Sequence, residues 1–224
     1  MIKAVLFDMY ETLVSQYRCP QYFSAEMARD AGVDLAEFRK LWYPAEVGGY
    51  MTGEADYKET VAEVLSHFGI REEALLDRMA EKNRAFKRAA FEHIHEGILP
   101  LLSELSNRGI RIGLVSNCYV EEAAVIRSSV LFPYFDAVCL SCELGIKKPD
   151  PAIFLACAEE LGVFPSECLF TGDGGSEELP AAKSLGMTAV QAFWYLSEQD
   201  PAAGRIEDFP CAVSPECILQ FLRF

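Results

Sequence analysis

Four segments of the chain carry polar side chains that could supply the groups of one reaction site. They are Asp8, Ser116 with Asn117, Lys148, and Asp173 with Glu177 and Glu178. A carboxylate can attack phosphorus or an activated carbon to give an acyl intermediate that water then opens. A lysine ammonium can neutralise both that carboxylate and an anionic substrate. Each of these residues alone could instead cap a helix or a turn, so the hypothesis depends on whether the segments meet.

The polar segments come after apolar runs that are typical of buried strands. Five such runs recur along the chain: Ala4–Phe7, Ile112–Val115, Ala137–Leu140, Cys168–Phe170 and Thr188–Gln191. Each is followed by a turn and a helical pattern, which predicts a parallel sheet with helices on both faces. Ligands of such sheets bind beyond the carboxyl ends of the strands, so the polar segments are expected to converge there.

The pattern changes between the first and the second apolar run. For about a hundred residues only helical periodicity is present, over Phe23–Ala31, Leu35–Trp42, Tyr57–Phe68 and Glu73–Arg88. We therefore predict an α/β fold, a doubly wound Rossmann-like core formed by residues 1–14 and 91–224. An all-helical cap over residues 15–90 is predicted to be inserted into it.

Composition and charge restrict the partners and the location of the protein. Twenty Lys and Arg residues against 34 Asp and Glu residues give the 224-residue chain a net charge of −14. No general attraction to nucleic acid or to anionic lipid is expected, which favours a small-molecule substrate. The sequence contains neither a run of 18 uncharged apolar residues nor a secretory signal, so we expect a cytoplasmic monomer or homodimer with no membrane partner.

The eight cysteines are expected to be buried or free thiols, since a cytosolic chain of this length rarely relies on disulfides. Cys139 and Cys142 form a lone C-x-x-C pattern. Without a second pair at zinc-ribbon spacing, and with Val138 and Leu140 interleaved as in a strand, we favour a structural role over metal or redox use.

The ordered set of polar segments resembles the haloacid dehalogenase (HAD) superfamily, which includes phosphatases and dehalogenases. Its four motifs match Asp8 with Thr12 in FDMYETL, Ser116 in GLVSN, Lys148 in KKPDPAIF, and Gly172-Asp173 with Glu178. The resemblance implies that Asp8 is the nucleophile, that Thr12, Ser116 and Asn117 bind substrate, and that Lys148 neutralises charge. Lys148 is preferred to Lys147 because the family lysine stands directly before the proline. The helical insertion corresponds to the family's cap.

Asp173, Glu177 and Glu178 would add carboxylates to a site that already contains Asp8. Like charges at short distance are costly unless a cation lies among them. Mg²⁺ prefers oxygen ligands and commonly uses one or two carboxylates, which suits Asp8, Asp173 and the main-chain carbonyl of Tyr10. Glu178 stands where the family commonly has Asp, and it could act through water or bond to Lys148. Glu177 is interpreted as a solvated residue or as a favourable charge in the first turn of a helix.

Tyr10 and Glu11 differ from the phosphatase pattern, and Arg39 is a further candidate for substrate binding. Tyr10 stands where phosphatases of the superfamily carry the Asp that protonates the leaving oxygen, and a tyrosine with a pKa near 10 is a poor proton shuttle. The family's 2-haloacid dehalogenases carry Tyr there, since halide leaves without a proton. Glu11 occupies a position that is usually Gly. Arg39 could bind a substrate carboxylate as the dehalogenase cap arginine does, or it could be a solvated helix residue.

The sequence thus predicts a Mg²⁺-dependent hydrolase of small phosphate esters, acting through an aspartyl-phosphate at Asp8. Metal-free 2-haloacid dehalogenation is the alternative that Tyr10 supports, although those enzymes lack the Gly-Asp pair found at Gly172-Asp173. A further alternative is a HAD-fold binding protein that has lost turnover because Tyr10 and Glu11 replaced the usual residues.

Overall fold

The computed structural model describes residues 1–196 and 204–222, and its centre is a parallel sheet. The six strands are β1 (Ala4–Phe7), β2 (Arg111–Ser116), β3 (Ala137–Leu140), β4 (Cys168–Gly172), β5 (Thr188–Ala192) and β6 (Cys211–Ala212). Their order is β3-β2-β1-β4-β5-β6, and every pairing is parallel. This confirms the predicted Rossmann-like α/β core. β6 was not predicted, because a two-residue strand leaves no periodic pattern in the sequence.

The central strand β1 is buried on both faces, which explains its uninterrupted apolar run. Val5 and Phe7 belong to one hydrophobic cluster, whereas Ala4 and Leu6 belong to the other. Successive side chains of a strand point to opposite faces, so each cluster takes every second residue. Because β1 lies between β2 and β4, the residue after it comes close to the ends of both neighbours.

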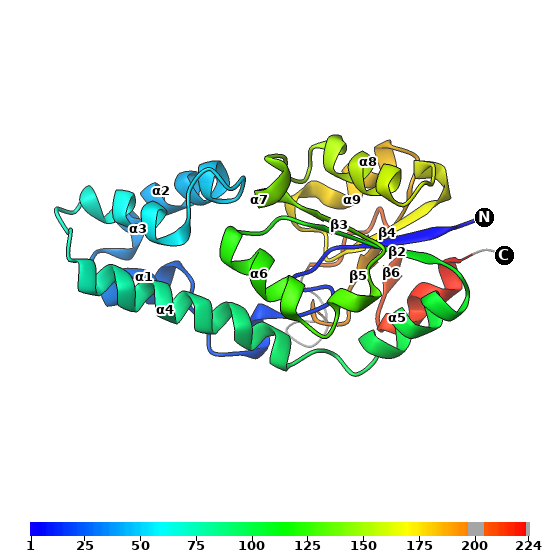
Figure 1. Cartoon of the computed structure of the whole chain (residues 1–224), viewed down its shortest axis with the longest axis horizontal. Helices are drawn as coiled ribbons and strands as arrows, with labels where there is room; N and C mark the ends of the chain where they lie inside the picture. Colours follow the sequence, from blue (N-terminus) through cyan, green and yellow to red (C-terminus); the bar gives the residue numbers. More distant parts are fainter. Residues whose placement is uncertain (197–203, 223–224) are drawn as a thin grey trace.

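Helices cover both faces of the sheet (Figure 1). The helices of the core are α5 (Ile98–Asn107), α6 (Val120–Ser128), α7 (Ser141–Leu144), α8 (Pro151–Glu160) and α9 (Glu178–Ser184). Side chains of α5 and α6 pack in the cluster that contains Val5, and those of α8 and α9 pack in the cluster that contains Leu6. The helices therefore cover both faces of the sheet, and a ligand can approach it at the ends of its strands.

The segment between β1 and β2 forms a helical lobe that extends away from the sheet (Figure 1). Its helices are α1 (Ser24–Ala31), α2 (Leu35–Ala45), α3 (Tyr57–Ser66) and α4 (Glu73–Ala89). Local signals fix their ends, since Asp34 and Asp56 accept bonds from backbone amides of the first turns of α2 and α3. The four predicted helices are thus present. The division of the chain at residues 15 and 90 stays a prediction.

No helix within residues 1–196 and 204–222 combines the length and the apolar character that a membrane span requires.

Candidate active site

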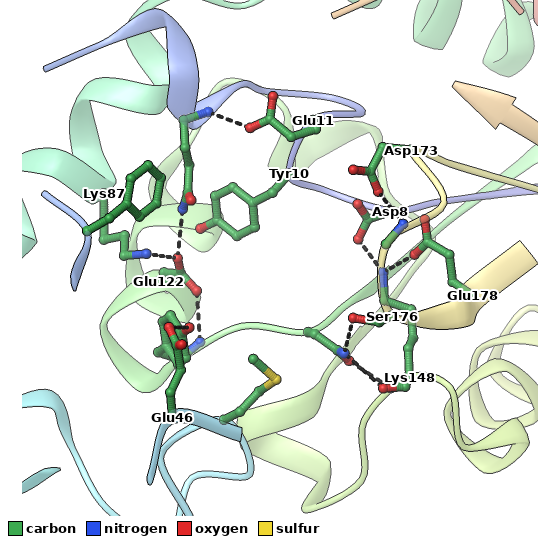
Figure 2. A pocket seen from close by; sticks show the side chains of 16 residues that line it. Asp8, Tyr10, Glu11, Glu46, Lys87, Glu122, Lys148, Asp173, Ser176 and Glu178 are labelled. Atoms are coloured by element: carbon green, nitrogen blue, oxygen red, sulfur yellow. Dashed lines mark hydrogen bonds and ion pairs between the residues drawn. The ribbon is translucent and has the colours of Figure 1, made fainter. Parts of the chain in front are cut away.

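A cavity of about 250 Å³ lies beyond the carboxyl ends of β1, β2 and β4, next to the helical lobe (Figure 2). Asp8 follows β1 directly, and its backbone N–H donates to the carbonyl of Thr171 in β4 at 2.9 Å. Residues that line the cavity and were predicted from the sequence are Asp8, Tyr10, Asn117, Lys148, Asp173 and Glu178. The polar segments therefore meet at one place.

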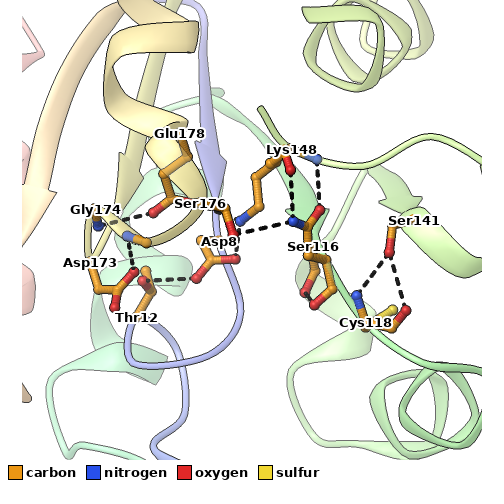
Figure 3. Close-up of polar contacts among 12 residues, drawn as sticks. Asp8, Thr12, Ser116, Cys118, Ser141, Lys148, Asp173, Gly174, Ser176 and Glu178 are labelled. Atoms are coloured by element: carbon orange, nitrogen blue, oxygen red, sulfur yellow. Dashed lines mark hydrogen bonds and ion pairs between the residues drawn. The ribbon is translucent and has the colours of Figure 1, made fainter. Parts of the chain in front are cut away.

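Lys148 is the buried centre of the acidic group (Figure 3). Its ammonium donates to Asp8 Oδ1 and, at 2.5 Å, to Glu178 Oε2. Burial works to lower the pKa of the Lys148 ammonium, but the attraction of Asp8 and Glu178 outweighs it and raises this pKa above its usual value. Lys148 therefore keeps its charge throughout the physiological pH range.

The three carboxylates carry more charge than one lysine can balance. Burial raises the pKa of Glu178 to about 8, with the charges of Asp8 and Asp173 adding to the effect and Lys148 opposing it. Burial and the charge of Asp8 also raise the pKa of Asp173. One oxygen from each carboxylate lies within 4.8 Å of the others, a set that suits a small hard cation. Among the described residues this is the only cluster of three or more candidate metal ligands of the His, Cys, Asp and Glu types.

Gly172 explains why a glycine precedes Asp173. A Cβ atom at this position would lie 2.0 Å from Glu178 Oε1, so a larger residue would displace the Glu178 carboxylate from its present position. The backbone N–H of Gly174 also donates to Glu178 Oε1 at 3.1 Å. The end of β4 and the start of α9 thus hold Glu178 against Lys148.

Three of the predicted substrate-binding residues lie close to Asp8 but differ in exposure. Asn117 lines the cavity and fixes the loop of Lys148, since its side chain accepts from Lys148 N at 2.7 Å and donates to Lys148 O at 3.0 Å. Thr12 is buried and donates to Asp8 Oδ2 at 3.3 Å. Ser116 is fully buried, with its hydroxyl 3.5 Å from the carbonyl of Asn117. Thr12 and Ser116 do not line the cavity.

The two residues that depart from the phosphatase pattern both line the cavity. Burial, followed by the nearby charge of Glu122, raises the pKa of Tyr10 well above its ordinary value, so the phenol stays protonated. Glu11 adopts φ 55°, in the left-handed region that favours glycine, and its carboxylate accepts from Ser15 Oγ at 2.6 Å and from Gln16 N at 2.8 Å. These bonds offset the strain of that conformation.

Sequence reasoning missed the residues on the wall opposite Asp8. Lys87 of α4 forms a buried ion pair with Glu122 of α6, with Nζ and Oε1 2.7 Å apart (Figure 2). Glu122 also accepts from Gln16 Nε2 at 3.2 Å and from Tyr119 N at 2.9 Å. The helical spacing could have indicated that Lys87 is buried, because it lies on the same stripe of α4 as the buried Ala80 and Asn83. A charged residue is unexpected there.

Arg39 is not brought to Asp8. It lies on the exposed side of α2, donates to Ser24 Oγ at 3.0 Å, and lines a different cavity inside the helical lobe.

The cysteines are free thiols. Cys142 contacts Cys118, with their sulfur atoms 3.7 Å apart. Cys139 is buried in the sheet. The structural role of the C-x-x-C pattern stays a prediction.

The family model of haloacid dehalogenase-like hydrolases matches residues 2–186. The chain belongs to this family. Among curated proteins, a glyceraldehyde 3-phosphate phosphatase of Methanopyrus kandleri is 28% identical over 85% of this chain and 84% of its own length. A phosphoserine phosphatase of Thermus thermophilus is 28% identical over 90% of this chain and 93% of its own length. This HAD-family chain is therefore a hydrolase with phosphatases among its relatives.

Solved structures of both chemistries share the HAD fold of this chain. A 2-haloacid dehalogenase of Pseudomonas syringae superposes with a TM-score of 0.71 and 22% identity, covering 99% of this chain and 98% of that one. A HAD phosphatase of Thermococcus onnurineus gives a TM-score of 0.66 and 22% identity, covering 99% and 98%. The fold is common to both activities, so the side chains of the site must distinguish them.

Proposed function

We propose that the protein is a Mg²⁺-dependent phosphatase that hydrolyses phosphate monoesters of small alcohols. The observation that carries this proposal is the cluster of Asp8, Asp173 and Glu178 around Lys148, whose ligand oxygens lie within 4.8 Å of one another. A nucleophile for haloacids would need no cation, whereas a phosphoryl group brings two negative charges to these carboxylates. The names of the curated relatives support the same chemistry.

The carboxylates Asp8 and Asp173 and the main-chain carbonyl of Tyr10 would hold the ion, with Glu178 positioned through Lys148. Mg²⁺ bound there supplies charge neutralisation and orients the phosphoryl oxygens.

In the first step an oxygen of Asp8 attacks phosphorus, and the bond from phosphorus to the alcohol oxygen breaks. The departing oxygen takes a proton from solvent, because the buried Tyr10 phenol holds its own proton tightly. In the second step water attacks the phosphorus of the aspartyl-phosphate and gives a proton to solvent, and the bond from phosphorus to the Asp8 oxygen breaks. Asp8 leaves as a carboxylate, with inorganic phosphate as the product. Lys148 keeps its positive charge beside Asp8 through both steps.

Dehalogenation is the second candidate, and Tyr10 is the residue that favours it. A carboxylate-binding cation should then lie near the nucleophile. Arg39 lines the adjoining cavity of the lobe and not that of Asp8, and the charge of Lys87 in the cavity of Asp8 is already paired with Glu122, which weighs against this candidate.

The test uses acetyl phosphate and 2-chloropropionate, each with Mg²⁺ and with EDTA. We expect phosphate release that needs Mg²⁺, and no chloride release. Asp8→Asn keeps the shape of the side chain but cannot form the acyl phosphate, so turnover should fall below a few per cent, while Asp208→Asn at an exposed position should keep it. Chloride release in EDTA would establish the dehalogenase instead, and folded protein inert on both substrates would support the binding protein.

A further inference from the structure

A second cavity, of about 300 Å³, lies inside the helical lobe and adjoins the cavity of Asp8. Phe23, Glu46, Lys87 and Tyr119 line both cavities. An alcohol whose phosphoryl group faces Asp8 can therefore extend past these residues into the lobe. The two spaces together fall in the ~300–1,000 Å³ range that is usual for small-molecule sites.

Aromatic rings form most of the wall of this cavity. Trp42 meets Tyr50 and Tyr57 at centroid distances of 6.0 and 6.1 Å, and Tyr50 stacks on Tyr119 at 3.9 Å. Burial raises the pKa of the phenols of Tyr50 and Tyr57, so these rings stay neutral. The rings pack against one another and hold a fixed shape, which suits a flat ring lying against their faces and edges.

Two polar groups in this wall, the hydroxyl of Tyr57 and the side-chain amide nitrogen of Asn83, lack a hydrogen-bond partner. Asn83 of α4 is 3% exposed, and its Nδ2 atom is buried without a hydrogen-bond partner. Buried amide groups in folded proteins are nearly always bonded, and an exception commonly marks the place of a ligand or an ordered water. A donor of this kind selects for a hydrogen-bond acceptor.

We propose that the alcohol part of the substrate carries a flat ring with a hydrogen-bond acceptor on its edge. The ring occupies the aromatic cavity of the lobe, and the acceptor meets Asn83 Nδ2. This rests on the proposed phosphatase function. Three-carbon alcohols, such as those of the esters that the curated relatives are named for, would leave this cavity empty and Asn83 unbonded.

The test compares three esters that share one primary alkyl spacer: 3-(3-pyridyl)propyl phosphate, 3-phenylpropyl phosphate and propyl phosphate. We expect kcat/KM to rise from propyl to phenylpropyl and to rise again, on the order of tenfold, with the pyridine acceptor. Acetyl phosphate, which has no ring, measures the basal reaction. If acetyl phosphate is turned over but the three esters react equally, the ring proposal fails and the phosphatase stands.

Asn83→Leu removes the donor at similar volume. The pyridyl-to-phenyl ratio of kcat/KM should fall to about one. Asn107→Leu, at an exposed position of α5, should leave this ratio intact. A ratio that Asn83→Leu does not change overturns the role of Asn83.

Binding gives a readout that does not depend on turnover. Calorimetric titration of the three esters into the Asp8→Asn protein should give the same order of affinities. Equal affinities would overturn the proposal even if the protein hydrolysed nothing.

Discussion

Tyr10 limits which phosphate esters the protein should hydrolyse rapidly. Its ring lines the cavity, but its hydroxyl lies near Glu122 on the wall opposite Lys148 (Figure 2). Because the Tyr10 phenol stays protonated and buried, it cannot shuttle a proton between the leaving oxygen and water. Esters with good leaving groups should therefore react far faster than alkyl phosphates.

Replacing Tyr10 by Asp should supply the missing acid and base. General acid catalysis contributes about 10²–10⁴-fold, so kcat for propyl phosphate should rise toward that range, while p-nitrophenyl phosphate gains much less. Tyr10→Asn, which has the same size without the acid, should give no such gain. Equal gains for the two variants would show that space, and not proton transfer, limits the reaction.

Glu11 links the stability of the protein to pH. Burial raises the pKa of Glu11 from 4.5 to about 7, with its bonds to Ser15 and Gln16 opposing the shift. The folded state thus binds this proton more tightly than the unfolded state. The resulting stability is present below pH 4.5 and is lost as the pH rises through about 7.

The glutamine of the Glu11→Gln variant cannot ionise. The free energy of unfolding of this variant should therefore increase relative to that of the wild type as the pH rises from 4.5 to 7. Urea unfolding in EDTA at several pH values measures this difference. Glu177→Gln is the matched control, because Glu177 also has a left-handed backbone, with φ 50°, but an exposed side chain. A pH-independent difference for Glu11→Gln would show that its carboxyl does not titrate in this range.

At the scale of elements, the junction of β4 and α9 sets the position of the charged cluster. Glu178 is the first residue of α9, and its carboxylate packs on Gly172, the last residue of β4. Bonds from Gly174 and Lys148 complete its surroundings. The Gly-Asp pair is therefore a steric requirement of the strand end as much as a source of a metal ligand.

Gly172→Ala should force Glu178 away from Lys148, because the new Cβ would lie 2.0 Å from Oε1. We expect a loss of about 1–3 kcal/mol in unfolding free energy, as is typical of overpacked sites. In the Glu178→Ala background the same substitution should cost much less, since the clashing carboxylate is gone. Additive losses in this double-mutant cycle would place the strain elsewhere.

In the whole molecule, the start of α6 is one place where the helical lobe is attached to the core. Glu122 pairs with Lys87 of α4, and the neighbouring Glu121 accepts from the backbone N–H of Tyr57 at 2.9 Å and from the Tyr50 hydroxyl at 3.2 Å. These contacts close the lobe over the carboxyl ends of the strands. The cavity is consequently bounded by both parts of the chain.

Binding of Mg²⁺ should stabilise the whole native state. A ligand at 100 times its Kd adds about 2.7 kcal/mol, which corresponds to a rise of roughly 5–10 °C in melting temperature for a chain of this size. Asp173→Ala should abolish the rise, whereas Glu177→Ala, at an exposed neighbouring position, should keep it. A melting curve that does not respond to millimolar Mg²⁺ would contradict the metal site and favour metal-free chemistry.

Sequence patterns alone predict the parallel core and the residues of the charged cluster. Strands such as Ala4–Phe7 are buried on both faces, so their sequences are continuous apolar runs. Asp8, Lys148 and Asp173 follow such runs, and the geometry of a parallel sheet brings strand ends together regardless of the connecting segments. The helices of the lobe could also be predicted, because helix caps and hydrophobic periodicity depend on residues that are close together in the sequence.

The residues that face Asp8 across the cavity could not be predicted without the packing of the lobe on the core. Lys87 and Glu122 are 35 residues apart on two different helices, and no local pattern predicts that they pair. The separation of Arg39 from the nucleophile, the burial of Ser116 and the aromatic cavity around Asn83 likewise follow from tertiary packing. Packing depends on side chains distant in sequence, so these features have no signature along the chain.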